Sequence, residues 1–147
     1  MGAGSGQNIT GVTIGGIGAG AGGNISGITI GGIGAGCGGE LQGLIIGGIG
    51  VGASQIQGIA LGGIGVGGDK ITGAALALGI VKVKENGQLT GLAFSAHNRI
   101  LGKQSGISLG ILNYAWKLEG IQIGLLNYVR DNPKFLKLLP LINFHFD

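Results

Sequence analysis

The sequence is poor in the residues that stabilise or equip most small proteins. Its 147 residues include one cysteine, Cys37, two prolines and only 5 % aromatic residues. A single cysteine excludes an internal disulfide and a cysteine-based metal site. Charged residues make up 10 % of the chain and hydrophobic residues 44 %, a balance opposite to that of disordered chains. Glycine interrupts every apolar run before the roughly 18 residues that a membrane-spanning helix needs.

Basic residues are absent from the first half of the chain. Residues 1–69 hold no lysine or arginine, and all nine basic residues lie from Lys70 onward. A basic end can attract anionic lipid or nucleic acid. Because these cations are scattered, we interpret them as solvated charges, predict no specific nucleic-acid partner and leave membrane contact open. The first residues also lack a secretory signal, so we expect an exported protein to contain this chain as a processed or excised piece.

Glycine is abundant, with 37 residues, and it marks a short internal repeat. One glycine recurs every 14 to 18 residues, and we use it as the anchor of each unit. The anchors are Gly11, Gly27, Gly43, Gly58, Gly73, Gly91, Gly106 and Gly120, with a degenerate ninth unit at Leu136. Such a short period is typical of solenoids, whose units bury apolar side chains by stacking on their neighbours. We predict an all-β, parallel β-solenoid of about nine short coils.

Apolar columns in the repeat predict which side chains form the core. Positions one and three after the anchor are apolar, as at Ile28 and Ile30, whereas the residue between them is mostly small or polar. This alternation predicts that the two apolar columns face inward and the middle column outward. Further inward columns are expected two before the anchor, as at Ile25, and six and eight after it, as at Ile33 and Ala35.

Two columns change along the chain. Positions five and eight after the anchor grow from Gly16 and Ala19 to Leu125 and Tyr128, which predicts that the solenoid widens toward the C-terminus. Position seven changes from glycine to asparagine. Its members are Gly18, Gly34, Gly50, Gly65, Ile80, Asn98, Asn113, Asn127 and Asn143. This exchange indicates either a left-handed backbone or a ladder of hydrogen-bonded amides, and both interpretations stay open.

The repeats predict a single domain over residues 1–147. We expect glycine-rich coils at 8–72, a longer irregular coil at 73–90, coils with asparagine and aromatic residues at 91–130, and a C-terminal cap at 131–147. Asn86-Gly87 lies in the longest spacing and predicts a loop that bulges from the fifth coil.

Glycine also predicts a surface for partners. In the first four coils, glycines alternate with the expected inward positions, among them Gly18, Gly34, Gly50 and Gly65. Glycine within a strand often marks close approach by another backbone or a ligand, and the first coil has an open edge. We therefore expect a homo-oligomer, or contact with a segment of the parent protein, through this glycine face or the N-terminal edge.

The sequence provides no catalytic constellation. We predict no enzyme activity and no catalytic, cofactor-binding or metal-binding residues. Cys37 occupies a column of alanines and is expected to be an enclosed thiol, and His97 a packed or edge imidazole. Tyr114, Trp116 and Tyr128 could form an aromatic platform, but the tyrosines continue an apolar column and are expected to pack in the core.

The later units carry a resemblance. Gly106-Ile-Ser-Leu-Gly-Ile-Leu-Asn113 and Gly120-Ile-Gln-Ile-Gly-Leu-Leu-Asn127 resemble the Gly-x-Gln-x-Gly-Leu-x-Asn repeat of bacterial surface-repeat proteins, over residues 106–146. The resemblance implies an exported, cell-surface location without known enzymatic activity. We therefore predict a non-enzymatic structural or adhesive module of a bacterial surface protein.

Two alternatives to this function stay open. The first is a small outer-membrane β-barrel with one antiparallel strand per unit, which fits the length of the repeat. The second is an ice-binding solenoid, since Thr13 and Thr29 begin a regular array that ends at Ile45.

Overall fold

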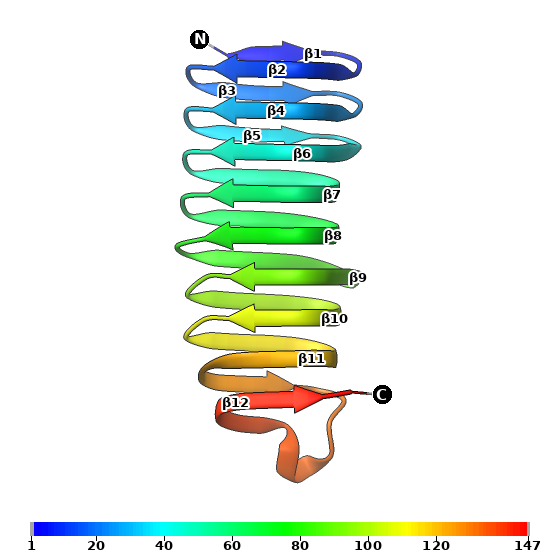
Figure 1. Ribbon diagram of the computed structural model, residues 1–147, viewed down its shortest axis with the longest axis vertical. Coiled ribbons are helices and arrows are strands. Elements are labelled where there is room, and N and C mark those ends of the chain that lie inside the picture. Colours follow the sequence, from blue (N-terminus) through cyan, green and yellow to red (C-terminus); the bar gives the residue numbers. More distant parts are fainter. Residues whose placement is uncertain (1, 147) are drawn as a thin grey trace.

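The computed structural model describes residues 2–146, which fold into a straight stack of β-coils (Figure 1). We number the coils one to eight by their anchor glycines. The strands are β1 (Ala3–Ser5), β2 (Ile9–Gly15), β3 (Gly18–Ala21), β4 (Ile25–Gly31), β5 (Gly34–Cys37), β6 (Glu40–Gly47), β7 (Gly50–Gly62), β8 (Gly65–Ala77), β9 (Ile80–Phe94), β10 (His97–Leu109), β11 (Leu112–Val129) and β12 (Leu138–His145), with a 3-10 helix η1 (Lys134–Leu136).

The strands form two stacks that enclose a narrow core. One stack holds β2, β4, β6 and the second halves of β7 to β11, and the other holds β1, β3, β5 and their first halves. Each pairing from β1 to β11 is parallel, and the anchors stay in register, so that Gly11 pairs with Gly27 and Gly27 with Gly43. The register shifts once within each of the pairs β8–β9, β9–β10 and β10–β11. The predicted parallel β-solenoid is therefore confirmed, and the antiparallel pairing of the alternative architecture is wrong for these strands.

The anchor glycines have the special backbone of the repeat. Their φ angles lie between +106° and +131° in the first seven coils and reach +157° at Gly120. A side chain at Gly58 would also collide with the carbonyl oxygen of Gly43 in the coil before it. Glycine is therefore required here both by its conformation and by the close approach of the neighbouring backbone.

The inward and outward columns differ from the prediction on one face. The column two before the anchor is buried as expected, with Ile25 and Ile56 fully inaccessible. Positions one and three after the anchor point outward instead, and the residue between them is the buried one: Ile28 is 41 % exposed and Thr29 0 %. Inward and outward positions alternate without interruption through the anchor glycine. The residue two before the anchor and the residue two after it therefore both point inward. The expected threonine array of an ice-binding surface thus turns inward at Thr29.

The second stack contributes the other half of the core. Ala19, Ala35 and Val51, eight residues after their anchors, are buried as predicted. The prediction that position six faces inward is wrong, because Ile17 and Ile33 are half exposed at the corner between the stacks. Two glycines precede that corner residue in the first four coils. A side chain on glycines such as Gly32 or Gly48 would collide with a backbone carbonyl of the neighbouring coil.

The asparagines form a buried ladder. Asn98 lies in register with Val81 and Asn113, because the corner before it is one residue shorter than in earlier coils. The glycines and asparagines of position seven therefore belong to different columns. Asn98 Nδ2 donates to Asn113 Oδ1 at 2.7 Å, and Asn113 Nδ2 donates to Asn127 Oδ1 at 2.7 Å. The amide-ladder interpretation is confirmed for these three residues.

The left-handed interpretation is wrong for the same residues. Within residues 2–146, the non-glycine residues with positive φ are Asn86 and Leu141. Each ladder amide also binds a backbone carbonyl near the corner, as when Asn98 Nδ2 donates to the oxygen of Leu109 at 2.9 Å. The asparagines replace the buried valines of earlier coils by groups that satisfy one another.

The residues behind the predicted widening lie on the outside. Leu125 is 62 % exposed, and Ile111 and Phe144 are also exposed. The buried column grows from Ala35 to Val51 and then changes to the ladder asparagines, which are no larger than valine. The predicted growth of the inward side chains therefore holds only for the early coils, and in other residues than those expected.

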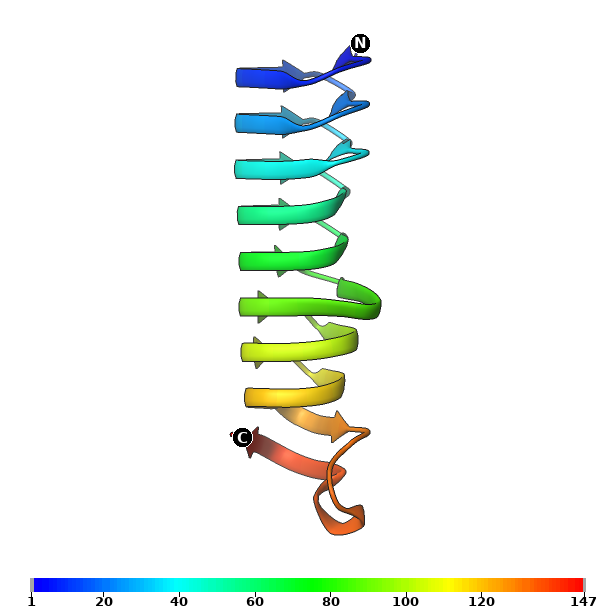
Figure 2. The ribbon, with the colours of Figure 1, turned by 90° about the vertical axis from the view of Figure 1, so that its right-hand side faces the viewer.

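The fifth coil and the C-terminal end depart from the regular repeat. Residues 84–87 bulge from β9 opposite Asp69, as predicted, and this coil reaches further out than its neighbours (Figure 2). Asn86 has φ 59° within the bulge. The ninth unit does not form another parallel coil, because β12 folds back antiparallel onto β11 after η1. Pro133 and the η1 residues reverse the chain there.

Candidate interaction surface

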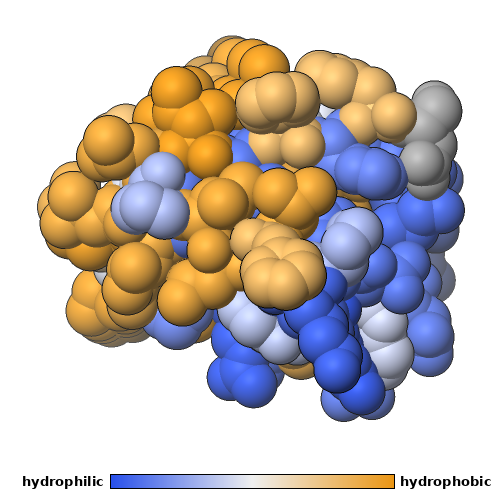
Figure 3. All heavy atoms as spheres, turned by 90° about the horizontal axis from the view of Figure 1, so that it is seen from below, coloured by the Kyte–Doolittle hydropathy of each residue, from blue (hydrophilic) through white to orange (hydrophobic). Residues whose placement is uncertain are grey.

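The outer surface of the first stack is apolar along the whole solenoid. Positions one and three after the anchor and the corner residue form three outward columns, and we call them together the apolar face. They are Val12, Ile28, Leu44, Ile59, Ala74, Leu92, Ile107 and Ile121; Ile14, Ile30, Ile46, Leu61, Leu76, Phe94, Leu109 and Ile123; and Ile17, Ile33, Ile49, Ile64, Leu78, Ala96, Ile111 and Leu125. Seen along the axis, hydrophobic and hydrophilic residues gather on opposite sides of the molecule (Figure 3).

A groove runs along the apolar face in coils three to six. It has a volume of about 490 Å³. Its lining is Ile46, Gly47, Gly48, Leu61, Gly62, Gly63, Leu76, Ala77, Leu78 and Phe94. The corner residues Ile49 and Ile64, which we call the ridge, follow the glycine pairs directly in the chain. The face therefore presents a groove with a ridge beside it.

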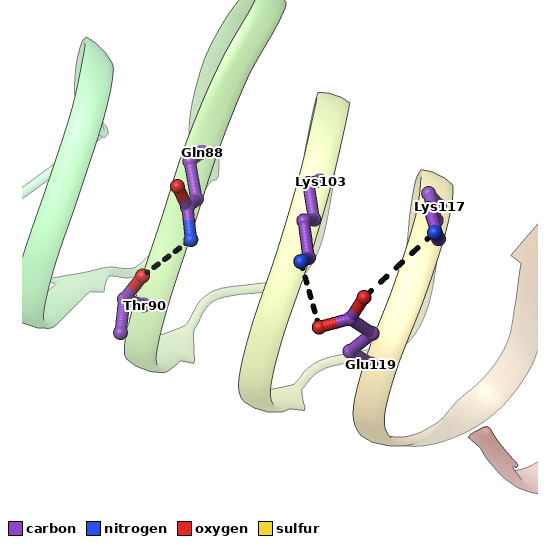
Figure 4. Close-up of polar contacts among 5 residues, drawn as sticks. All are labelled: Gln88, Thr90, Lys103, Lys117 and Glu119. Atoms are coloured by element: carbon purple, nitrogen blue, oxygen red, sulfur yellow. Dashed lines mark hydrogen bonds and ion pairs between the residues drawn. The ribbon is translucent and has the colours of Figure 1, made fainter. Parts of the chain in front are cut away.

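A polar column borders the apolar face. The residues that precede the anchors are Thr10, Ser26, Gln42, Gln57, Thr72, Thr90, Ser105 and Glu119. Gln88 Nε2 donates to Thr90 Oγ1 at 3.1 Å, and Glu119 pairs with Lys103 at 2.7 Å and Lys117 at 3.8 Å (Figure 4). The apolar face thus has an uncharged rim in coils one to seven and an ion-paired one in coil eight.

The predicted glycine face lies on the outside of the second stack. Gly18, Gly34, Gly50 and Gly65 are half-buried and point outward between buried positions. A Cβ atom at Gly34 would lie 3.6 Å from its nearest neighbour, the carbonyl oxygen of Gly50, which is ordinary contact. Ile80 occupies the same column one coil after Gly65. The fold itself therefore does not require glycine at these positions.

Cations and aromatic rings continue this second face toward the C-terminus. Lys82, Arg99 and Tyr114 stand in register in successive coils. Tyr114 stacks on Tyr128 with ring centroids 5.3 Å apart, and the Arg130 guanidinium lies 4.1 Å from the centroid of Trp116. The prediction that the tyrosines pack in the core is wrong, since they point outward. Their stacking covers one face of each tyrosine ring.

The other two candidate residues from the sequence are Cys37 and His97. Cys37 is half-buried beside the core, and burial raises the pKa of its thiol, with the Glu40 carboxylate acting in the same direction. His97 is half-buried at an outward strand position. Among residues 2–146, no group of three His, Cys, Asp or Glu side chains could hold a metal ion. That part of the chain also has no helix with the length and hydropathy to cross a membrane.

Comparisons with protein-family models, curated proteins and solved structures found no match to this chain. The resemblance of residues 106–146 to bacterial surface-repeat proteins stays a prediction. The surfaces of the solenoid are therefore the evidence for its function.

Proposed function

We propose that this chain is a non-enzymatic structural or adhesive module of a bacterial surface protein, which holds a protein partner against its apolar face. The main support for this proposal is that the apolar face continues over all eight coils. Contiguous apolar patches on soluble monomers rarely exceed about 300–600 Å², and larger ones mark interaction sites. Already the column one after the anchors places an outward residue in every coil, and Ile28 and Ile59 are among its exposed members.

The rim supports a protein partner. Interfaces between proteins combine an apolar centre with a polar border. The border here consists of neutral threonine, serine and glutamine side chains over most of its length. The repeated columns favour an extended contact over a single reactive centre, which fits a structural role.

The glycine face is the second proposed contact. Because Gly18, Gly34 and Gly50 have room for a side chain, their lack of one is best explained by another backbone that approaches from outside. Gly65 continues the same column, with Ile80 of the next coil close to it. We assign this contact to a segment of the parent protein or to another chain. The same assignment extends to the N-terminal edge, where β1 and β2 each pair with one neighbouring strand within residues 2–146.

Intact cells that make the full-length protein can test this function. A membrane-impermeant, amine-reactive label should modify exposed lysines that all variants keep, such as Lys70 and Lys134, without lysis. The variant Ile28→Thr, Ile59→Thr, Ile107→Thr should then lower attachment of the cells to protein-coated surfaces or to one another severalfold, at an unchanged amount of labelled protein. The matched control Lys82→Gln, Lys84→Gln, on the other side of the solenoid, should not. Labelling only after lysis, or equal attachment of all variants, would contradict the proposal.

A further inference from the structure

The loop that links β11 to β12 combines exposed apolar side chains with basic ones. It comprises residues 130–137 and projects beyond the last strand at the C-terminal end of the stack (Figures 1 and 2). We propose that this loop, which we call the tip, binds the surface of an anionic lipid bilayer. Phe135 and Leu136 enter the boundary between headgroups and acyl chains. Lys134 and Lys137 bind the phosphate groups. The inference goes beyond the function proposed above and does not rest on it.

Phe135 is exposed to an unusual degree. Its side chain is 94 % accessible, the largest fraction among the exposed large hydrophobic residues of the part of the chain that the structure describes. Leu136 and Leu138, close to it in the chain, are exposed as well. Single apolar side chains on a surface are ordinary, but the tip presents three of them on a projecting loop. Contact with acyl chains would remove this apolar surface from water.

The backbone of the tip is held in place, so the exposure of Phe135 belongs to a defined loop. The N–H of Val129 donates to the carbonyl oxygen of Lys137 at 2.8 Å and closes the loop at its base. Asn132 is buried, and its Nδ2 donates to the carbonyl oxygen of Leu136 at 3.3 Å. The polar groups of the loop thus bond within the protein, whereas the phenyl ring points away from it.

The charges of the tip match an anionic surface. Residues 130–137 contain the three cations Arg130, Lys134 and Lys137 and the single carboxylate of Asp131. Neither lysine has an ion pair within residues 2–146. Lysines beside exposed phenylalanine and leucine are typical of proteins that bind anionic membranes at the interface. Arg130 also lies over the ring of Trp116, a residue type favoured at that depth.

The shape of the tip favours lipid over a protein partner. A specific protein interface buries about 800 Å² on each side, more than one short loop provides. A bilayer needs no complementary pocket and accepts a few side chains at any point, in a weak and reversible contact. The solenoid would then stand end-on, with its first coil roughly 38 Å from the lipid at about 4.8 Å per coil. The apolar face would stay free for a protein partner.

Co-sedimentation with vesicles tests the lipid as partner. We expect the chain to bind vesicles of phosphatidylcholine with phosphatidylglycerol, and to bind pure phosphatidylcholine about tenfold more weakly or less. Phe135→Ser should weaken binding to the mixed vesicles about tenfold, because it removes the inserted ring. Lys134→Gln, Lys137→Gln should have a similar effect and lower the dependence on salt. Phe135 and Lys134 are exposed, so circular dichroism should show the fold unchanged.

Matched controls change the same residue types elsewhere. Ile17→Ser, at an exposed position in the first coil, and Lys70→Gln, Lys82→Gln should bind like the parent chain. No binding at about 1 mM lipid, where a myristoyl chain with a binding constant of about 10⁴ M⁻¹ is mostly bound, would overturn the inference. Equal binding of the parent chain and Phe135→Ser would also overturn it. Self-association that Phe135→Ser abolishes, without vesicle binding, would replace the lipid by a protein partner.

Fluorescence tests the orientation. Trp116 is the single tryptophan of the sequence, so Phe135→Trp in a Trp116→Phe background reports on the tip alone. Its emission should shift to the blue on mixed vesicles and be quenched by brominated acyl chains. Ile17→Trp in the same background should show neither effect, and equal quenching of both would overturn the end-on contact. These vesicles contain no protein, so retained vesicle binding with unchanged cell attachment of the Ile28→Thr, Ile59→Thr, Ile107→Thr variant would contradict the proposed function alone.

Discussion

At the scale of single residues, glycine has two different roles in this chain. The anchor glycines have a positive φ, and from Gly27 onward the carbonyl of the preceding anchor occupies the space of a side chain. The glycines of the outer face, such as Gly34, have neither restriction. The high glycine content of the sequence therefore has two separate causes. The fold requires glycine at the anchors, whereas the glycines of the outer face are a property of the surface.

Alanine substitutions should separate the two roles. Gly58→Ala should lower the free energy of unfolding by at least about 1–3 kcal/mol, since alanine is strained at φ 122° and its Cβ would meet the Gly43 carbonyl. Gly34→Ala should leave stability within about 1 kcal/mol of the parent or raise it slightly. Denaturant unfolding of both variants gives the comparison. Equal destabilisation would show that Gly34 is also needed by the fold.

At the scale of the strand, inside and outside are set by alternation and not by hydrophobicity. Ile56 and Ile59 are the same residue type within one strand, β7, yet Ile56 is fully buried and Ile59 is 46 % exposed. Anchor Gly58 lies between them, and the buried positions on its two sides are separated by an even number of residues. Each coil thus places isoleucine both in its core and on its surface.

This assignment can be tested by deletion of side chains. Ile56→Ala should cost about 2–5 kcal/mol because it removes a fully packed side chain from the core. Ile59→Ala should cost less than about 1 kcal/mol when unfolding is measured at concentrations where the chain is monomeric. A larger effect at Ile59 than at Ile56 would reverse the inside and outside of the solenoid.

The sequence was sufficient for the architecture but not for the phase of the strands. The period predicted parallel stacking, and the column at Ile25 was correctly placed inside. The column at Ile28 was misplaced because an apolar outer surface has the same composition as a core. The groove and the ridge could not be predicted from the repeat, since they depend on which of two apolar columns points outward.

The asparagines illustrate a second limit. Aligning the units by residue number placed Asn98 with Gly65, whereas in the structure it pairs with Val81. A corner shortened by one residue shifts every later position, and composition alone does not reveal such a shift. The exchange of valine for asparagine would have signalled a change from apolar packing to a hydrogen-bonded core.

At the scale of the whole molecule, the core changes character along the stack. The early coils bury small side chains such as Ala19 and Ala35. The later coils bury the asparagine ladder, where each amide is bonded to the next. Since each coil contacts mainly its neighbours, stability is expected to differ between the two ends.

Hydrogen exchange should detect this gradient. Amides of β2 to β5 should exchange before those of the second halves of β8 to β10, because the early coils bury fewer and smaller apolar side chains. Mass spectrometry of exchanged, protease-digested protein resolves these segments. Uniform protection, or faster exchange in the later coils, would contradict the expected gradient.

The in-register stacking has a consequence for how such a chain can change in length. Because each coil meets its neighbours through the same positions, a duplicated or deleted repeat would leave the sequence of contacts above and below it intact. Each added repeat would extend the molecule by about 4.8 Å without altering its chemistry. Reach thus becomes a property set by the number of repeats.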